Sequence, residues 1–273
     1  MSILIITVNY KDSEPTEHLI KSIINCKINR NIKMLIIDNE SSESSFCSLE
    51  LLREKTNLDI EIIRSTKNTY YWGGINLGLN KFYNNEKDYE WIIACNNDIE
   101  FNDIYFFQKL KNLKESHYSI IAPKIISSLT NKDLNPFLAE PLSFIYDIYY
   151  NLYYLNFFTS KIVRRIGHLI KSLKKISKIN DSSNNQIYAP HGSCIIFNKL
   201  FFSNGGFLDT GFTMYGEEVS IAEIANKIKS FIYYVPSLSL IHNEHQSTRK
   251  SSLKSNFLHS KETYYYLKKK YRS

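Results

Sequence analysis

The sequence predicts an α/β fold, with a parallel sheet that carries helices on both faces. In the first half of the chain, apolar runs of strand length alternate with amphipathic stretches of helical period, at the spacing of successive βα units. The first four predicted strands also end in polar side chains. In such sheets ligands bind beyond the carboxyl ends of the strands, so these polar groups mark the expected binding edge.

The predicted elements follow one another closely. The pattern indicates strands and helices in alternation, with strands at 3–10, 33–39, 58–65 and 89–98, and helices at 14–26, 48–55 and 74–84. In the first helix, Leu19, Ile20 and Ile23 recur at helical spacing between polar residues, which is typical of a helix with one buried face.

Polar side chains stand where these strands end. They are Asn9, Tyr10, Asp38, Asn39, Asn68, Asn96, Asn97 and Asp98. Because the carboxyl ends of parallel strands meet at one edge, we expect these groups to lie near one another. Asn and Asp also form turns and cap helices, so each strand end taken singly has a structural explanation as well.

Composition favours a globular chain. The 273 residues suit one large domain, or a domain with an appended segment, and 43% of them are hydrophobic. The four cysteines are scattered without a metal-binding spacing, so we expect reduced thiols. The amino terminus has no basic region before its apolar run and predicts a first strand, not a signal peptide, so we expect a cytoplasmic protein.

Two nucleotide-binding classes are disfavoured by the turn after the first strand. A nicotinamide-binding fold needs a glycine-rich turn there, and this turn, "VNYKDSEPT", has no glycine. The sequence also has no phosphate-binding loop of the GxxxxGK[ST] type. The net charge of +7 nevertheless indicates an anionic partner.

Several motifs resemble inverting family 2 glycosyltransferases, the bacterial rhamnosyltransferase-like enzymes with a GT-A fold. "CNND" at 95–98 is similar to the metal-binding "LNxD" form of that family, and "STKNTYYWGGINLGLN" at 65–80 resembles its glycine-containing segment. "GGFLDTGFTMYGEEVSIAEIANK" and "YYVPSLSLIHNEHQST" resemble two further motifs in the same order. The resemblance implies a mostly parallel mixed sheet flanked by helices.

The resemblance also implies a donor site for a UDP- or dTDP-sugar. It assigns nucleotide-sugar binding to Asn9, Tyr10, Asp38, Asn68, Gly74, Asn76, Asn96, Asn97 and Asp98. A divalent metal, Mg²⁺ or Mn²⁺, would be held by Asp98 and His242 against the diphosphate, where it stabilises the charge of the leaving group. The motif has a single carboxylate where the full pattern has two.

The resemblance further implies residues for the chemical step. Inversion needs a base that takes the proton of the acceptor hydroxyl, and the second acidic position of the motif makes Glu218 that base. The acceptor side would be formed by Trp72, His191, Gly192 and Glu217. Taken alone, the two glutamates are also ordinary at the start of a helix, where acids favour the helix dipole.

The expected domain division follows these motifs. Residues 1–136 and 186–250 would form one GT-A catalytic domain, with a nucleotide-binding half at 1–125 and an acceptor half at 186–250. Residues 137–185 would be an inserted aromatic and basic helical segment, and 251–273 a basic helix or tail. Seven Lys or Arg and no acid occur in 161–178, which is typical of a helix at a membrane surface, although a hairpin packed on the domain or on a partner subunit stays open.

We therefore expect a transferase that moves rhamnose or another hexose to a cell-envelope glycan or polyprenyl-linked acceptor, of the O-antigen or capsule type. We expect it at the inner face of the plasma membrane, with a peripheral contact through 137–180, possible oligomers and no nucleic acid partner. A sugar nucleotidyltransferase and a non-catalytic membrane or polyanion-binding module are the alternatives. Nucleotidyltransferases need a basic glycine-rich loop that is missing here, and a non-catalytic module would tolerate replacement of Asp98 and Glu218.

Overall fold

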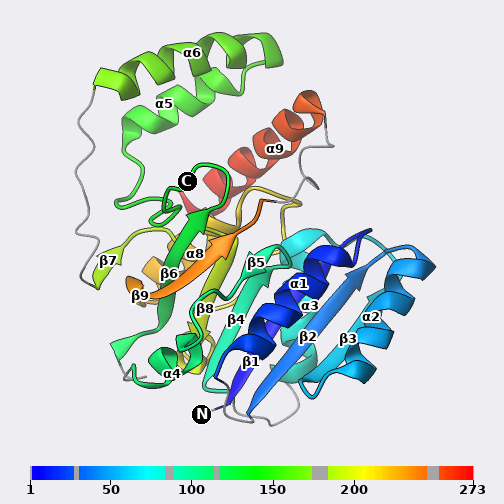
Figure 1. Cartoon of the computed structure of the whole chain (residues 1–273). Helices are drawn as coiled ribbons and strands as arrows, with labels where there is room; N and C mark the ends of the chain where they lie inside the picture. Colours follow the sequence, from blue (N-terminus) through cyan, green and yellow to red (C-terminus); the bar gives the residue numbers. More distant parts are fainter. Residues whose placement is uncertain are drawn as a thin grey trace.

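The computed structural model describes residues 2–27, 31–83, 89–113, 117–173, 184–244 and 252–272. Within these residues one nine-stranded sheet has the order β3-β2-β1-β4-β8-β6-β9-β5, and β7 pairs with β9 (Figure 1). The strands are β1 Ile3–Asn9, β2 Ile32–Asn39, β3 Asp59–Ser65, β4 Trp91–Asn96, β5 Ile99–Glu100, β6 Ile120–Ser127, β7 Asn185–Ile187, β8 Cys194–Asn198 and β9 Ile232–His242.

The helices of the described residues cover both faces of this sheet and extend beyond it. They are α1 Glu14–Asn25, α2 Glu43–Lys55, α3 Tyr70–Tyr83, α4 Phe106–Lys111, α5 Phe144–Tyr153, α6 Phe157–Leu173, α7 Lys199–Ser203, α8 Glu217–Lys227 and α9 Leu253–Tyr271. The expected alternation of strands and helices in the first half is therefore present, and the α/β class is confirmed.

Strand direction decides which residues reach the binding edge. β1, β2, β3 and β4 run parallel, so their carboxyl ends meet at one edge. β8 runs antiparallel to β4, which brings the start of β8 to the same edge. β6 is antiparallel to β8 and parallel to β9, so the end of β9 arrives there too. The edge thus collects strand ends from both halves of the chain.

Two hydrophobic clusters fix the helices on the sheet. One face of β1 and β2 packs Ile3, Ile5 and Met34 against residues of α1, α2 and α4. The other face packs against α3, α7 and α8, where Trp72 lies in the centre of the cluster with no exposed surface. Alternating side chains of one strand reach opposite faces, so strands that are apolar throughout belong in the middle of three layers.

Helix α3 begins four residues before the predicted start at 74. Its first turn contains Tyr70, Tyr71 and Trp72, which precede the predicted helix. The early start is held by side chains from other strand ends: the Asn68 carbonyl accepts a hydrogen bond from the Tyr70 amide at 2.8 Å, and the Asn39 amide donates to the Tyr70 carbonyl at 3.2 Å. Such tertiary contacts are absent from local sequence patterns.

Gly74 allows α3 to approach the sheet closely. A Cβ at this position would lie 2.6 Å from Cγ2 of Val8 on β1, which is closer than two carbon atoms can stand. The sequence predicts that Gly74 lets the backbone approach a sugar nucleotide. In the structure its neighbour is Val8, so the glycine serves the contact between helix and sheet.

The segment 137–173 adds a helical hairpin, α5 and α6, that stands away from the sheet (Figure 1). The hairpin meets α9 through aromatic rings: the ring centroids of Tyr154 and Tyr264 are 5.1 Å apart, and those of Tyr153 and Phe257 are 6.0 Å apart. No side chain of α5 is buried. Residues 174–183 of the predicted insertion lie outside the described residues, and its status as an insertion stays a prediction.

We expect Gly74→Ala to destabilise the fold by about 1–3 kcal/mol, the usual cost of overpacking a well-filled core. Gly73→Ala is the matched control in the same helix, because its Cβ would meet only the Thr69 side chain at 3.3 Å, and it should stay within about 1 kcal/mol of wild type. Urea unfolding followed by circular dichroism measures both. Equal stability of the two variants would contradict the assigned role of Gly74.

Candidate functional site

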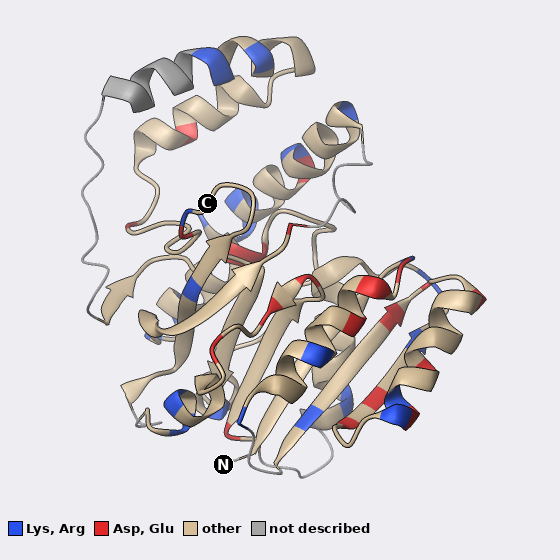
Figure 2. Cartoon of the chain, in the orientation of Figure 1, with Lys and Arg blue, Asp and Glu red and all other residues tan. Residues whose placement is uncertain are grey.

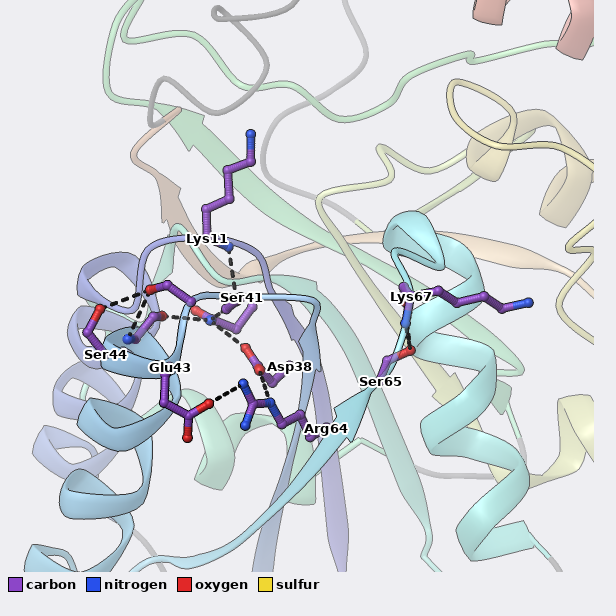
Figure 3. Close-up of polar contacts among 11 residues, drawn as sticks. Lys11, Asp38, Ser41, Glu43, Ser44, Arg64, Ser65 and Lys67 are labelled. Atoms are coloured by element: carbon purple, nitrogen blue, oxygen red, sulfur yellow. Dashed lines mark hydrogen bonds and ion pairs between the residues drawn. The ribbon is translucent and has the colours of Figure 1, made fainter.

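The ends of β1 and β2 form a buried polar network (Figure 3). The Asn9 amide donates to the Asp38 carboxylate at 3.1 Å and to the Ser41 hydroxyl at 3.0 Å, and its carbonyl accepts from Thr16 at 2.7 Å. Asn9 and Asp38 have no exposed surface. Each polar atom of Asn9 is thus used inside the protein, so Asn9 orients Asp38, and the predicted direct contact of Asn9 with a donor is not available in this conformation.

Asp38 is covered by one arginine. The Arg64 Nε atom lies 3.8 Å from Oδ2 of Asp38, and its guanidinium also binds Glu43 at 2.7 Å (Figure 3). The guanidinium stacks on the Phe46 ring, 4.4 Å from the ring centroid. Oδ2 of Asp38 has no hydrogen-bond partner among the described residues. A ligand group that reaches this oxygen must therefore take a place beside or instead of Arg64.

The other residues predicted for the donor lie at the same edge in different settings. Asn97 donates to Thr16 at 3.0 Å, which ties the end of β4 to the network around Asn9. Asn96 is half-buried, and its amide N–H donates to the Ser193 carbonyl at 2.8 Å. Tyr10 is 37% exposed beside Lys11, and Asn76 is half-buried on α3.

Trp72 does not lie where the sequence predicts it. The resemblance placed it at the acceptor, but the side chain has no exposed surface and belongs to the core cluster under α3. The physical reason is the early start of α3, which turns Trp72 from a loop position into the buried face of a helix. An acceptor cannot reach it in this structure.

Asp98 and His242 lie side by side at the ends of β4 and β9. Their atoms Oδ1 and Nε2 are 3.1 Å apart, and both side chains are 11% exposed. The pairing of β5 with β9 and a hydrogen bond from the Asn243 amide to the Asp98 carbonyl at 2.9 Å hold the two segments together. Residues 144 positions apart in sequence therefore present an oxygen and a nitrogen to the same point.

This pair fits two ligands of one divalent cation. Neighbouring ligands of an octahedral cation with bonds of about 2.1 Å stand about 3.0 Å apart, close to the separation seen here. Among the described residues, no group of three or more His, Cys, Asp or Glu could hold a metal. Mg²⁺-type sites often use one or two carboxylates together with substrate phosphates, so the pair suits a metal that binds along with a diphosphate.

His191 connects this pair to the acidic side of the site. Its ring centroid lies 6.1 Å from that of His242, and its Nδ1 atom is 2.8 Å from the Ser193 hydroxyl. The Asn135 carbonyl accepts the His191 amide N–H at 2.7 Å. Burial, and then the neighbouring His242, lower the pKa of His191 to about 4, so the ring is neutral at neutral pH.

Gly192, the residue after His191, lies directly against Glu218. The Gly192 amide donates to Oε1 of Glu218 at 3.2 Å, and a Cβ at position 192 would lie 2.8 Å from that oxygen. The Tyr71 hydroxyl donates to the Gly192 carbonyl at 3.1 Å from the opposite side. A glycine is therefore required for the carboxylate of Glu218 to reach the loop that carries His191.

Glu217 and Glu218 form a buried acidic pair at the start of α8. Glu217 is 7% exposed, and its Oε2 atom accepts the Gly216 amide at 2.8 Å. Burial, and then the charge of Glu218, raise the pKa of Glu217 to about 8. Burial also raises the pKa of Glu218. One proton on the pair relieves the repulsion of two adjacent carboxylates in a poorly solvated place.

Sequence reasoning missed three residues that hold the site. Thr16 bridges Asn9 and Asn97, Tyr71 supports Gly192, and Asn135 fixes His191 while its own amide donates to the Pro123 carbonyl at 2.7 Å. Thr16 and Asn135 stand outside the motifs, and all three residues act through partners far away in sequence. Only Tyr71 carried a signal, because it lies inside the motif at 65–80.

The family model described as glycosyl transferase family 2 matches residues 2–202. A curated relative, the low-salt glycan biosynthesis hexosyltransferase Agl10 of Haloferax volcanii, is 25% identical over 242 residues. That match covers 88% of this chain and 66% of the relative, so the chain spans just under two thirds of its length. The resemblance of the motifs to family 2 is confirmed.

Solved structures show the same architecture at low identity. The S. aureus TarS structure 1–349 has a TM-score of 0.58 and 12% identity, with 89% of this chain and 60% of that 1–349 chain covered. The mannosyltransferase PcManGT of Pyrobaculum calidifontis, in complex with GDP-Man and Mn²⁺, has a TM-score of 0.56 and 12% identity, with 97% and 70% covered. These likenesses show the fold, and the predicted GT-A architecture is confirmed.

The raised pKa of Glu217 predicts a stability that depends on pH. Its pKa in the fold, about 8, exceeds the ordinary value of 4.5, so the stabilisation is complete below pH 4.5 and is lost as the pH rises through 8. Glu217→Gln removes this titration. Relative to wild type, its free energy of unfolding should rise by on the order of 4 kcal/mol between pH 5 and pH 9, about 1.4 kcal/mol for each pKa unit between pH 5 and 8.

Denaturant unfolding at pH 5, 7 and 9 measures this difference. Glu262→Gln, at an exposed position on α9, is the matched control and should follow wild type at each pH. A Glu217→Gln curve that runs parallel to wild type over the same range would show that Glu217 is ionised in the fold.

Proposed function

The chain belongs to glycosyl transferase family 2, and on that basis we propose that it is an inverting transferase that moves a hexose from a nucleoside diphosphate sugar to a glycan. The observation that carries this proposal is a chain of contacts: Asp98 pairs with His242, the His242 ring lies near that of His191, and the amide of the next residue, Gly192, binds Glu218. It brings a candidate metal pair and a candidate base to one edge of the sheet, as sugar transfer from a diphosphate requires.

The donor would lie over the ends of β1, β2 and β4. Asp38 would bind the base or ribose, and the nearby polar groups that would complete the donor site are Tyr10, Asn68, Asn76, Asn96 and Asn97. A UDP- or dTDP-sugar, with rhamnose or another hexose, remains the proposed donor. Support comes from solved neighbours that are described in complex with UDP-GlcNAc or with UDP, GalNAc and Mn²⁺, although another holds GDP-Man.

A divalent metal, Mg²⁺ or Mn²⁺, would be held by Asp98 and His242 together with the diphosphate. When bound, such an ion supplies positive charge that stabilises the departing nucleoside diphosphate. The protein contributes the fixed separation of the two ligands and a nearly buried setting, in which a charge interaction is stronger than in water.

Glu218 would remove the acceptor proton. The acceptor oxygen forms a bond to the anomeric carbon while the bond from that carbon to the diphosphate oxygen breaks, and the hydroxyl proton passes to the Glu218 carboxylate. The Gly192 amide holds this carboxylate in place. His191 and Gly192 would line the acceptor side. Glu217, held in its protonated form, would carry no negative charge that repels the Glu218 carboxylate.

We further propose a cell-envelope glycan, such as an O-antigen or capsule unit or its lipid-linked precursor, as the acceptor, and a cytoplasmic enzyme at the inner face of the membrane. The role of the Haloferax relative in glycan biosynthesis supports the substrate class. Of the described helices, none is both long and apolar enough to cross a membrane. The exposed apolar and basic residues of 137–165, the part of this segment whose side chains the structure describes, support a peripheral contact.

Asp98→Ala should abolish the Mn²⁺-dependent part of nucleotide binding. Calorimetric titration of UDP and of dTDP, with and without Mn²⁺, measures it, and we expect a loss of at least tenfold in affinity when the metal ligand is removed. Asp59→Ala, at the opposite end of β3, is the matched control and should bind as wild type does. Equal binding by Asp98→Ala and wild type would exclude Asp98 as a ligand.

Glu218→Gln should lower kcat by about 10²–10⁴-fold while donor affinity stays unchanged, because a general base acts only in the chemical step. In wild type the rate should rise with pH, since the base must be deprotonated. Burial raises the pKa of Glu218, so this rise should be centred above the ordinary value of 4.5. Initial rates across the pH range check both points, and a variant with normal kcat would remove Glu218 from the mechanism.

A further inference from the structure

A cavity of about 460 Å³ lies between the α5–α6 hairpin and α9. Tyr215 and Val219 form part of its lining, and in sequence they flank the acidic pair that contains Glu218. Tyr215 has φ +67°, a left-handed backbone that turns the chain just before α8. The cavity therefore reaches the residues on either side of the acidic pair, while Glu218 itself is not part of its lining. Its volume falls in the usual range of small-ligand sites, about 300–1,000 Å³.

Tyrosine rings form one wall of this cavity. Tyr149 and Tyr153 are stacked with centroids 6.1 Å apart, and Tyr150 and Tyr154 are stacked at 6.0 Å. Tyr264 of α9 faces them, with its centroid 5.5 Å from that of Tyr150. A flat aromatic face with a hydroxyl at its rim is apolar in the middle and polar at the end. This suits a sugar ring, which has C–H faces and a rim of hydroxyl groups.

The charged side chains of the lining are cations. Arg164, Lys268 and Arg272 take part, and no Asp or Glu occurs among the described residues of the lining. Arg272 is bound to Glu223 at 3.0 Å and to Asp147 at 3.4 Å, so its charge is matched. Lys268 instead donates to the neutral Asn151 at 3.2 Å, and Arg164 is exposed. The two are placed to bind an anion, and phosphate is the anion that Arg binds best through paired N–H groups.

A second cavity, of about 330 Å³, continues the first between the start of α6 and the start of α9. It shares Tyr153, Arg164, Tyr215 and Ser260 with the first and adds residues that include Phe157 and Lys161. Lys and Arg recur along α6 and α9 (Figure 2). We call the two cavities together the hairpin groove.

Beyond the groove, the hairpin exposes large apolar side chains to solvent. Phe144 is 77% exposed, Ile145 75%, Phe158 76% and Ile162 61%. Apolar groups of this size rarely gather on the surface of a soluble protein unless they meet a partner or a membrane. Lys161, which also lines the second cavity, stands between Phe158 and Ile162 in the sequence of α6, and such a mixture of apolar and basic side chains favours an anionic lipid surface.

We propose that the hairpin groove binds the acceptor as a sugar attached to the phosphate of a lipid. The sugar lies against the tyrosine wall near Glu218, the phosphate lies between Arg164 and Lys268, and the lipid chain runs toward the exposed apolar side chains of the hairpin. The inference rests on the proposed function, because it names the substrate that Glu218 deprotonates. Under this proposal the α5–α6 hairpin helps to select the acceptor.

Calorimetric titration with dodecyl phosphate below its micelle concentration tests the groove. Wild type should bind this probe, and Arg164→Gln and Lys268→Gln should each weaken binding by about tenfold, as expected for loss of one charged contact. Arg165→Gln and Lys269→Gln are matched controls, since they remove the same charges from the same helices at exposed positions outside the lining. Both controls should bind as wild type does.

Two further probes separate the sources of the phosphate and of the apolar group. Inorganic phosphate should bind at least tenfold more weakly than dodecyl phosphate, and so should uncharged dodecyl maltoside. Equal binding of inorganic phosphate would reduce the groove to a site for free anions and would overturn the lipid assignment. Two results would overturn the role of Arg164 and Lys268. One is that wild type binds dodecyl maltoside as tightly as dodecyl phosphate, and the other is that all four variants bind dodecyl phosphate equally.

Titration of the same proteins with UDP and Mn²⁺ distinguishes failure of the groove assignment from failure of the transferase proposal. If every variant binds UDP as wild type does while dodecyl phosphate binds to none of them, wild type included, the groove assignment fails and the transferase proposal stands. If wild type binds no nucleotide in any condition, the transferase proposal fails, and the acceptor assignment falls with it.

Discussion

The antiparallel pairing of β4 with β8 is the constraint on which the site depends. β1 to β4 run parallel and would by themselves gather only residues of the donor half at their carboxyl edge. β8 pairs with β4 in the opposite direction, with Cys95 opposite Cys194, so the loop that precedes β8 ends beside the end of β4. A hydrogen bond from the Asn96 amide to the Ser193 carbonyl at 2.8 Å closes this junction. The loop then carries His191 toward His242 and Gly192 toward Glu218.

The two sides of the site differ in electrostatic character. Around Asp38 and Asn9, amide and hydroxyl donors and the guanidinium of Arg64 surround a single buried carboxylate. The carboxylates of Glu217 and Glu218 lie in one buried region and accept hydrogen bonds from the backbone amides of Gly216 and Gly192. Burial raises the pKa of both. The second setting favours a group that gains and loses a proton. This division matches the tasks of holding a nucleotide and accepting a proton.

Local pattern was enough for the strands and for the residues at their ends, because a buried parallel strand is apolar throughout and must stop at a polar turn. It was not enough for α3. "YYWGG" has the composition of a turn, and its helical form depends on Asn39 and Asn68, which reach it from two other strand ends. For the same reason Trp72 was expected in the site and lies in the core. Gly192 and Glu218 were each recognised, but their contact, across 26 residues, is a property of the fold alone.

Helix α9 joins the hairpin to the helix that carries Glu218. Its Tyr266 and Tyr271 hydroxyls both donate to Asp209, at 2.8 and 2.7 Å, while Arg272, just beyond its end, binds Glu223 of α8 and Asp147 of α5. Phe144 and Phe158 of the hairpin, which are 77% and 76% exposed, can vary while this junction persists, whereas a change in α9 must be matched by compensating changes in α8 and α5. Relatives should vary fastest at the exposed hairpin positions and slowest at this junction.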